Sequence, residues 1–308
     1  MESKKKPHSG VIVPMITPFT EDGDLDEPAV RKVTEYLASN GVSVFLLGTT
    51  GEAASIPSGM KDRLVELAAE SLQGNTRLYA GISDTCLETS VQAARRYADC
   101  GVDAVVAHLP YYYPMRPDDM LHYYRTLADN IPLPLILYNI PATTHLSIPL
   151  DVVGKLSEHP RIAGIKDSER DAGRLREAID RWKDHQDFSV LIGWTAFSAE
   201  GLLQGADGLV PSTGNIAPGL FRQLYEAARR HAVDAAETFQ RQTDVVAEVY
   251  QKDRNLSQSL AALKCIMEYL GLCQPYTLPP IRALDDARRE DVRDQIEALN
   301  LNNILEME

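Results

Sequence analysis

The chain has 308 residues, of which 44% are hydrophobic and 24% are charged, and its formal net charge at pH 7 is -13. This length exceeds that of one ordinary core but suits an α/β barrel with a terminal extension, and the composition is that of a soluble globular protein. The acidic balance argues against nucleic-acid or anionic-membrane partners, although a locally positive site could still accept an anionic substrate.

Apolar runs alternate with amphipathic segments along the first part of the chain. The runs predict strands over 11–16, 42–47, 77–82, 102–107, 133–138, 162–166, 188–192 and 208–210. The segments between them predict helices over 28–40, 60–72, 87–100, 117–130, 149–158, 170–182 and 196–203. Near-continuous apolar strands separated by amphipathic helices indicate a parallel sheet covered by helices.

The number of strand–helix units decides the architecture. Eight units in about 220 residues favour a closed (β/α)8 barrel over an open doubly wound sheet. Beyond this region the sequence predicts helices over 220–233, 235–250, 257–270 and 285–299. We therefore expect the fold class α/β, a (β/α)8 TIM barrel with the active site in residues 1–225 and a C-terminal helical extension in residues 226–308.

The cysteines and the start of the chain bear on location. Cys86, Cys100, Cys265 and Cys273 form no C-x-x-C pair and no dense framework, which predicts reduced packing residues in a cytoplasmic protein. The apolar run after the first residues is too short and too interrupted for a signal peptide, and no run approaches a membrane-spanning length. We expect a cytoplasmic protein with neither a nucleic-acid nor a membrane partner.

One lysine stands apart from the other nine. Lys166 ends the sixth expected strand, whereas the others lie in the N-terminal tail or in expected helices and their ends. Function in such a barrel lies where strands end and the following loops begin. A lysine in an apolar setting has a lowered pKa and becomes a usable nucleophile. The alternative is a strand-end lysine that reaches solvent or pairs with a carboxylate.

Polar and aromatic residues follow several other expected strands. They are Thr49, Thr50 and Glu52 after the second strand, Tyr111, Tyr112 and Tyr113 after the fourth, Tyr138 and Asn139 at the end of the fifth, and Ser212, Thr213 and Asn215 after the eighth. Each alone could be a tight turn, a wedged aromatic or a strand ending. All of these residues, like Lys166, are expected at the end of the barrel where the strands terminate, and this shared location favours a functional interpretation.

This set has a chemical logic. A lysine amine condenses with a ketone to an iminium, which acts as an electron sink for making or breaking the adjacent C–C bond. The turn Gly48-Thr49-Thr50-Gly51 can offer backbone N–H groups and two hydroxyls to a carboxylate. A phenol such as that of Tyr138 can transfer protons as a general acid and base.

Other cofactor chemistry has no motif in this chain. The seven histidines show neither H-x-H nor H-E-x-x-H spacing, and there is no G-x-G-x-x-G or Walker motif. We therefore expect no metal and no separate cofactor, the covalent lysine Schiff base taking that role.

Four motifs carry a resemblance that covers essentially the whole chain. They are Gly48-Thr49-Thr50-Gly51-Glu52, Pro110-Tyr111-Tyr112-Tyr113-Pro114, Tyr138-Asn139-Ile140-Pro141 and Gly164-Ile165-Lys166-Asp167-Ser168. In this order and spacing they resemble the dihydrodipicolinate synthase / N-acetylneuraminate lyase family of pyruvate-dependent class I aldolases.

The resemblance implies a role for each matched residue. Lys166 would form the Schiff base, Tyr138 would be the acid and base, and Thr49 and Thr50 would bind the pyruvate carboxylate, with Thr50 also relaying protons to Tyr138. Tyr112 matches a tyrosine that enters a neighbouring subunit's site in the synthases, and family members are commonly homotetramers built as dimers of dimers. The implied substrate-binding positions are Thr49, Thr50, Gly51, Thr143, Ser168, Gly193, Val210 and Ser212.

Departures from the family patterns bear on the substrate. Synthases carry an arginine two residues after the proline of the Tyr-Asn-x-Pro motif, where it holds the acceptor's carboxylate, but this chain has Thr143. Losing such a guanidinium removes about 1.5–3 kcal/mol of charged hydrogen bonding. Sialic-acid lyases carry an Asp-Glu pair after the seventh strand, where this chain has Thr195 and Ala196. Ser168 and Ser212 match hydroxyl-bearing positions of the sugar-acid lyases.

These comparisons place the chain nearer the sugar-acid branch than the strict synthases. We expect a carbon–carbon (or carbon–oxygen) lyase of the class I aldolase type that joins or separates pyruvate and an aldehyde, acting on a 2-keto-3-deoxy sugar acid. The alternatives are 4-hydroxy-tetrahydrodipicolinate synthase, which joins pyruvate to aspartate semialdehyde in lysine biosynthesis, and a non-catalytic barrel that binds a small molecule.

Overall fold

The computed structural model describes residues 6–72 and 76–299. Within these residues the strands form one closed barrel in the order β1 to β8, and further helices follow it. The expected (β/α)8 barrel with C-terminal helices is confirmed. The chain divides into two compact units, Met1–Ile12 with Arg77–Pro211 (the first unit) and Val13–Thr76 with Ser212–Glu308 (the second unit). The expected division at residue 225 stays a prediction.

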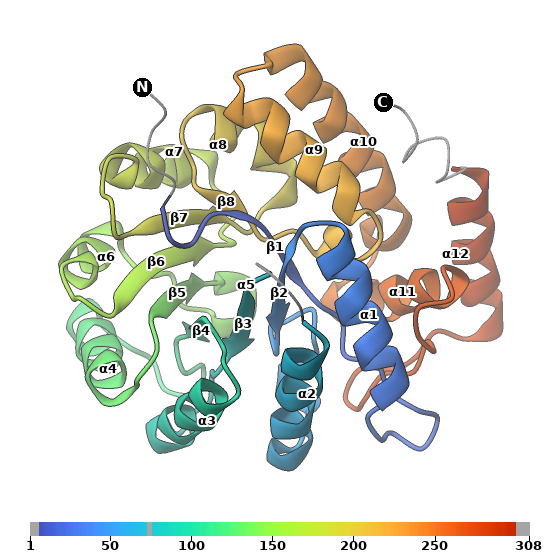
Figure 1. Cartoon of the computed structure of the whole chain (residues 1–308), viewed down its shortest axis with the longest axis horizontal. Coiled ribbons are helices and arrows are strands. Elements are labelled where there is room, and N and C mark those ends of the chain that lie inside the picture. Colours follow the sequence, from blue (N-terminus) through green and yellow to red (C-terminus); the bar gives the residue numbers. More distant parts are fainter. Residues whose placement is uncertain (1–5, 73–75, 300–308) are drawn as a thin grey trace. The chain divides into compact units, whose positions relative to one another are not determined.

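The first unit contains most of the parallel sheet (Figure 1). Its strands are the start of β1 (Gly10–Pro14), β3 (Leu78–Gly81), β4 (Ala104–His108), β5 (Leu135–Asn139), β6 (Ile162–Asp167), β7 (Ser189–Ile192) and β8 (Gly208–Leu209). Its helices are α3 (Leu87–Asp99), α4 (Pro117–Asn130), α5 (Pro141–Thr144), α6 (Leu150–Ser157), α7 (Ala172–Trp182) and α8 (Ser198–Leu203), with the short 3-10 helix η2 (Thr195–Phe197). Neighbouring strands from β3 to β8 pair in parallel, and so do β8 and β1.

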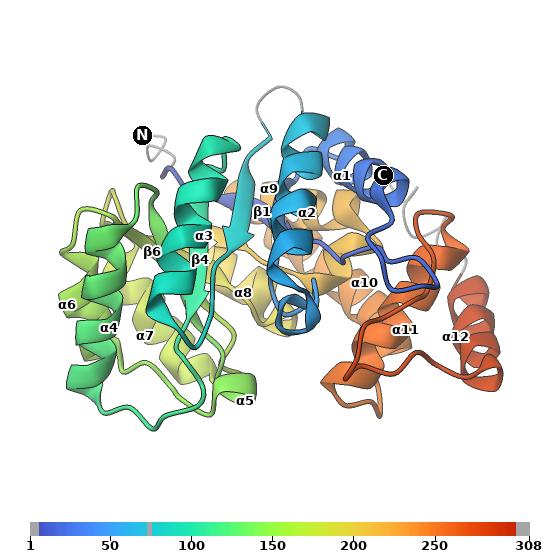
Figure 2. The ribbon, with the colours of Figure 1, turned by 90° about the horizontal axis from the view of Figure 1, so that it is seen from below.

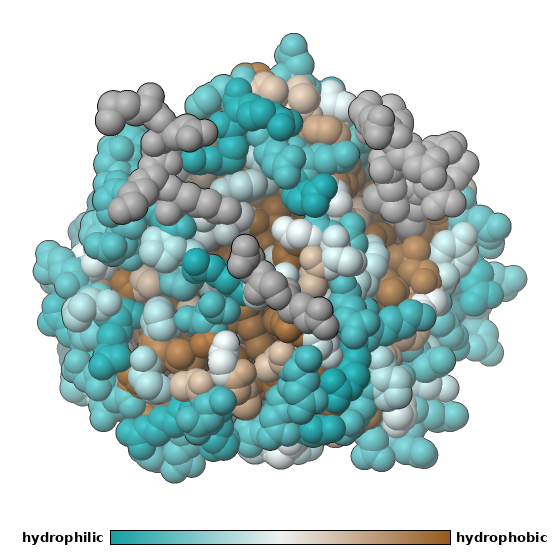
Figure 3. All heavy atoms as spheres, viewed as in Figure 1, coloured by the Kyte–Doolittle hydropathy of each residue, from teal (hydrophilic) through white to brown (hydrophobic). Residues whose placement is uncertain are grey.

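The outer helices of the first unit are amphipathic. In α3, Val91, Ala94 and Tyr97 are buried, whereas Arg95 and Arg96 are exposed. Figure 3 shows hydrophilic residues along the outer edge at α3 and hydrophobic residues nearer the strands. Burial of each large apolar side chain in such an interface contributes roughly 1.5–3 kcal/mol. The helices thus cover the strands and fix the positions of the strand ends.

Lys6 departs from the sequence prediction. Its Nζ lies 3.0 Å from Asp207 Oδ2 and donates to the carbonyl oxygens of Trp182 at 2.7 Å and Phe188 at 3.0 Å. Lys6 is therefore a buried anchor and not part of a tail, because a carboxylate and two carbonyl oxygens replace the water around its ammonium. Lys4 and Lys5 lie outside the described residues.

The second unit holds the end of β1 and the described helices of the C-terminal extension. Its elements are α1 (Glu27–Ser39), β2 (Ser43–Leu46), η1 (Ala53–Ser55), α2 (Ser58–Ser71), η3 (Ser212–Asn215), α9 (Pro218–Arg229), α10 (Val233–Gln251), α11 (Leu256–Tyr269) and α12 (Asp286–Ala298). Helix α10 packs on α9, and α12 lies beside α11 (Figure 2).

Three local predictions were wrong or incomplete. The helix expected over 220–233 ends at Arg229, where the Arg230 N–H donates to Glu226 O at 3.1 Å and His231 takes a left-handed φ of 56° that ends the helix. The short helix α5 was not foreseen. Cys86 is exposed and is not a packing residue, whereas Cys265 and Cys273 are buried as expected.

None of the helices in residues 6–72 and 76–299 combines the length and the apolar character needed to cross a membrane.

Candidate active site

Lys166 and Tyr138 meet at the ends of two neighbouring strands of the first unit. The parallel register of β5 and β6 sets Tyr138 opposite Lys166, so their side chains lie on the same face of the sheet. Both side chains are buried, and the Lys166 Nζ lies 3.9 Å from the centre of the Tyr138 ring. Because a ring face attracts a cation, the phenol holds the amine at the strand end. The structure thus brings together the predicted amine and the predicted acid and base.

His108 is a third member of this group that the sequence reasoning missed. It ends β4 opposite Tyr138 in the register, and the two rings lie 6.2 Å apart, edge to face. Burial lowers the pKa of His108, the Leu109 carbonyl opposes this at 2.8 Å from Nδ1, and the charge of Lys166 lowers the pKa further. A neutral imidazole therefore lies beside the phenol. Its place as the last residue of a strand was the available signal.

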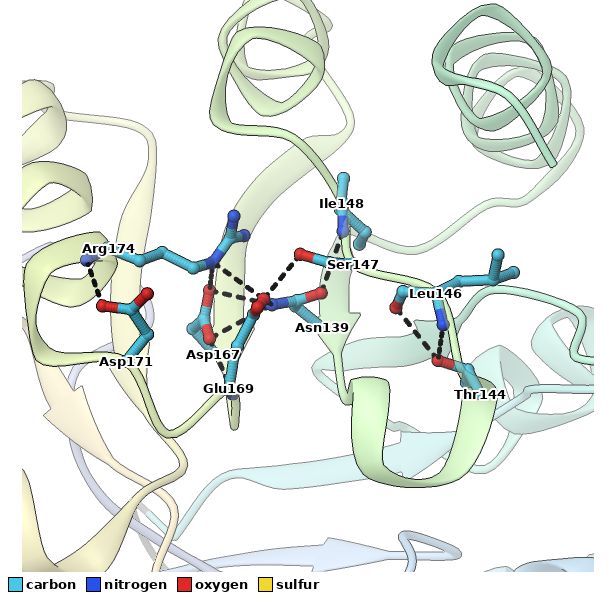
Figure 4. A network of polar contacts seen from close by, with 9 residues as sticks. All are labelled: Asn139, Thr144, Leu146, Ser147, Ile148, Asp167, Glu169, Asp171 and Arg174. Atoms are coloured by element: carbon cyan, nitrogen blue, oxygen red, sulfur yellow. Dashed lines mark hydrogen bonds and ion pairs between the residues drawn. The ribbon is translucent and has the colours of Figure 1, made fainter.

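The opposite face of the same two strands carries a polar network (Figure 4). Asn139 and Asp167 follow Tyr138 and Lys166, so strand alternation turns them toward the helices, and both are fully buried. Asn139 Nδ2 lies 3.2 Å from both carboxylate oxygens of Asp167, and Asn139 Oδ1 accepts from the Ile148 N–H at 3.0 Å. Both strand ends are thereby tied together directly behind the reactive pair.

Arg174 of α7 completes this network. Its Nε lies 2.8 Å from Asp167 Oδ2 and 3.3 Å from Glu169 Oε2 (Figure 4). Glu169 Oε2 also accepts from Asn139 Nδ2 at 2.9 Å and from the Ser147 hydroxyl at 2.6 Å. Burial raises the pKa of Asp167, and the Arg174 guanidinium opposes this shift. We call Asn139, Ser147, Asp167, Glu169 and Arg174 the Asp167 cluster, and its position fixes the backbone that carries Lys166.

Three of the implied substrate-binding residues directly follow the ends of β6, β7 and β8. The Ser168 N–H donates to Asn139 O at 2.9 Å, the Gly193 N–H to Asp167 O at 2.7 Å, and the Val210 N–H to Ile192 O at 2.8 Å. A Cβ at Gly193 would collide with the Ser168 hydroxyl and lie 3.0 Å from the Asp167 carbonyl oxygen, so any larger residue would displace Ser168. The β6, β7 and β8 ends are thus closely joined at these residues.

Thr143 lies on the short helix α5, which follows β5 in the chain. Its hydroxyl is 3.4 Å from the Ile140 carbonyl, and the residue is partly exposed. The side chain at this position is therefore a small hydroxyl close to its own backbone, and it carries no charge.

The tyrosines after β4 are exposed. Tyr111, Tyr112 and Tyr113 have exposed fractions of 55%, 72% and 72%, and the rings of Tyr112 and Tyr113 pack edge to face with centres 5.0 Å apart. A run of three exposed aromatic side chains is unusual on the surface of a monomer.

The second unit contains the Gly48–Glu52 turn. The Thr17 hydroxyl donates to Gly51 O at 2.7 Å, and a Cβ at Gly51 would lie 3.0 Å from the Met15 carbonyl oxygen, so glycine allows this close approach. Thr50 is buried and Thr49 is partly exposed. In the same unit, the Ser212 hydroxyl lies 2.8 Å from the hydroxyl of Tyr250. That these residues share a site with Lys166 stays a prediction.

Among the described residues, no group of three or more His, Cys, Asp and Glu side chains is arranged to hold a metal ion.

Comparison with known proteins identifies the family. The model of the dihydrodipicolinate synthetase family matches residues 7–299. The chain belongs to this family. A relative from Escherichia coli, named "Probable 2-dehydro-3-deoxy-D-pentonate aldolase YjhH", shares 30% sequence identity with this chain. The match covers 93% of this chain and 96% of the relative.

Two solved structures of the dihydrodipicolinate synthetase family extend the comparison. Dihydrodipicolinate synthase from Bacteroides thetaiotaomicron is similar with a TM-score of 0.90 and 31% identity, over 96% of this chain and 100% of that one. YagE from Escherichia coli, solved in complex with pyruvate, has a TM-score of 0.89 and 27% identity, over 96% and 99% of the two chains. The chain is therefore an enzyme, a pyruvate-dependent lyase of this family.

Proposed function

We propose that the enzyme reversibly cleaves a 2-keto-3-deoxy sugar acid into pyruvate and an aldehyde through a Schiff base on Lys166. The observation that carries this proposal is the contact between the buried Lys166 amine and the Tyr138 ring, 3.9 Å apart. An amine and a phenol at adjacent strand ends are the two groups that iminium chemistry requires.

The proposed reaction begins at the amine. Lys166 attacks the C2 ketone of the substrate, and the Tyr138 phenol gives its proton to the departing hydroxyl, so that water leaves, an iminium forms and Tyr138 becomes a phenolate. The Tyr138 phenolate takes the proton from the C4 hydroxyl, the C3–C4 bond breaks, and its electrons pass into an enamine while the aldehyde leaves. Protonation of the enamine carbon and addition of water then release pyruvate and the free amine.

The binding roles follow from the sequence prediction. In this proposal Thr49, Thr50 and Gly51 hold the keto-acid carboxylate through N–H groups and hydroxyls. Thr50 also passes protons to and from Tyr138. The remaining implied binding positions, which contact the hydroxylated tail, are Thr143, Ser168, Gly193, Val210 and Ser212.

The choice of a sugar acid rests on side-chain chemistry. Thr143 offers a hydroxyl where a second carboxylate would need a cation. The printed name of the relative YjhH, an aldolase for a 2-dehydro-3-deoxy-pentonate, supports the same substrate class. We therefore expect hydroxyaldehydes to be accepted more efficiently than aspartate semialdehyde.

A second candidate is the synthase reaction between pyruvate and aspartate semialdehyde. The likeness to the Bacteroides synthase, at 31% identity over nearly the whole chain, favours it. A panel of sugar acids and aldehydes, assayed for pyruvate release or consumption, separates the two. Efficient consumption of pyruvate with aspartate semialdehyde, and no turnover of any sugar acid, would overturn the sugar-acid assignment.

Covalent trapping tests the mechanism itself. Borohydride added with pyruvate should reduce the iminium, attach the three-carbon acid to Lys166 and inactivate the enzyme, with the site read by peptide mass spectrometry. Lys166→Met should abolish the adduct. Lys264, a fully buried lysine of α11, is an internal control that should stay unlabelled in both proteins. An adduct at another lysine, or none, would contradict the Schiff-base role.

We also propose a cytoplasmic homotetramer built as a dimer of dimers, with Tyr112 entering a neighbouring subunit's site. The 72% exposure of Tyr112 in the single chain supports a partner at this position. Sedimentation of the wild type should give a tetramer, and Tyr112→Ala should shift the distribution toward smaller species. Tyr269→Ala, at a tyrosine of α11 that is 42% exposed, is the matched control. A wild-type monomer at micromolar concentration would exclude this assembly.

A further inference from the structure

Glu52 closes the Gly48–Glu52 turn in an unusual way. It has a left-handed φ of 57°, which strains a residue that is not glycine, and it is 3% exposed. Its N–H donates to Thr49 O at 3.1 Å, and its carbonyl accepts from Ser55 N at 2.8 Å. A rotation of Glu52 would therefore move the peptide of Thr49.

The carboxylate of Glu52 is held from the C-terminal part of the second unit. Lys264 of α11, with an exposed fraction of 0%, places its Nζ 2.5 Å from Glu52 Oε1. The Leu278 N–H donates to Glu52 Oε2 at 3.2 Å. The same Lys264 Nζ donates to Tyr276 O at 2.6 Å and lies 4.0 Å from the centre of the Phe19 ring. Both the cation and the anion therefore have fixed partners.

Fold stability is a poor explanation for this pair. Removing two charges from water carries a large free-energy cost, and well-packed apolar residues often stabilise a fold as well or better. Burial raises the pKa of Glu52 and lowers that of Lys264, and the attraction between the two opposes both shifts. The short contact between these two buried charges instead ties a strained residue beside the turn to α11.

We propose that Lys264 is a positioning residue, which acts through Glu52 to fix the Gly48–Glu52 turn in the conformation that binds the keto-acid carboxylate. This inference rests on the proposed function, which assigns the carboxylate to that turn. It gives the helical extension a role in substrate binding, because the ammonium comes from α11 and the amide of Leu278 from the segment after it.

The test compares binding with chemistry in variants of the full-length enzyme. Lys264→Met keeps the aliphatic stem and removes the charge, and Glu52→Gln keeps the shape and an acceptor for Leu278. Each should raise the pyruvate concentration that half-saturates borohydride trapping by about 10-fold to 100-fold, since small displacements of a binding group have effects of this size. The trapping rate at saturating pyruvate should change by less than about threefold.

Lys32→Met is the matched control. Lys32 lies on α1 in the same unit and donates to Gly271 O at 2.5 Å, so it also contacts the C-terminal part, but from the exposed surface. It should leave the half-saturating concentration unchanged. If Lys264→Met does not fold, as judged by circular dichroism, Glu52→Gln decides the question alone.

The outcomes separate this inference from the proposed function. Trapping in the wild type, with unchanged half-saturation in Glu52→Gln, would overturn the positioning role and leave the Schiff base intact. A loss confined to the saturated rate would overturn it as well. Absence of any adduct at Lys166 in the wild type would overturn the proposed function and the inference together.

Discussion

Replacing Arg174 by methionine tests the Asp167 cluster. Arg174 is 11% exposed and Asp167 fully buried, and their atoms lie 2.8 Å apart. Removing one partner of a buried ion pair costs about 3–5 kcal/mol, because the other charge remains without compensation. Asp167 keeps the Glu169 N–H at 2.9 Å and the Asn139 amide, so we expect the lower end, about 3 kcal/mol of the free energy of unfolding.

The assay is urea unfolding followed by circular dichroism, with Arg176→Met as the control. Arg176 lies on the same helix in an exposed pair with Glu200 at 2.6 Å, and such pairs contribute at most about 1 kcal/mol. Equal losses in the two variants would refute the reasoning. Asp167→Asn in the Arg174→Met background should recover part of the loss, because it removes the uncompensated charge.

The pH dependence of the Arg174→Met deficit has a definite sign. Burial already raises the pKa of Asp167, and without the guanidinium it rises further. A carboxyl whose pKa is higher in the folded state binds more protons there, so its contribution to stability is lost as the pH rises above the unfolded value of about 3.9. The deficit should therefore be larger at pH 7 than at pH 5. A deficit that grows on acidification would contradict this account.

Two further predictions concern hydroxyl groups. Tyr138→Phe should retain the borohydride adduct but lower turnover by about 10²-fold to 10⁴-fold, the usual contribution of a general acid and base; unchanged turnover in a sugar-acid assay would exclude that role. Tyr250→Phe removes a hydroxyl that lies 2.8 Å from Ser212 Oγ and 2.9 Å from Thr213 Oγ1, and should raise the KM for the sugar acid without changing the half-saturation of pyruvate trapping. Equal effects on both measurements would argue for a general loss of structure.

The strand–helix rhythm was readable because buried parallel strands and amphipathic helices leave different periods in a sequence. Lys166 and Tyr138 were found for the same reason, since a polar residue at the end of an apolar run is conspicuous. His108 carries the same signal at the end of β4, but it was considered only as a metal ligand. Its place opposite Tyr138 depends on the register of β4 and β5, which the sequence does not display.

Other features depend on partners that are distant in the chain. Lys6 is buried because Asp207 and two carbonyl oxygens lie around it, and Lys264 because Glu52 does. The local sequence pattern does not indicate either distant partner. The sequence therefore places Lys6 in a tail and Lys264 only in a helix. Cys86 shows the opposite error, because the sequence predicts a buried packing residue and the side chain is exposed.

The meeting of Lys166 and Tyr138 itself depends on one irregularity. Leu135 pairs with Ile162, but the next residue of β5 pairs with Gly164, so Ala163 is an extra residue in β6. If Ala163 were paired with Ile136 and the register continued regularly, Tyr138 would face Ile165 and Lys166 would face Asn139. The amine would then lie on the side of the sheet that now holds the buried Asp167 carboxylate. Asn139 and Asp167, the first residues of the Asp167 cluster, directly follow Tyr138 and Lys166. The cluster joins the two strand ends and so holds the register that the bulge creates. The residues behind the sheet thus help to keep Lys166 and Tyr138 opposite each other on one face.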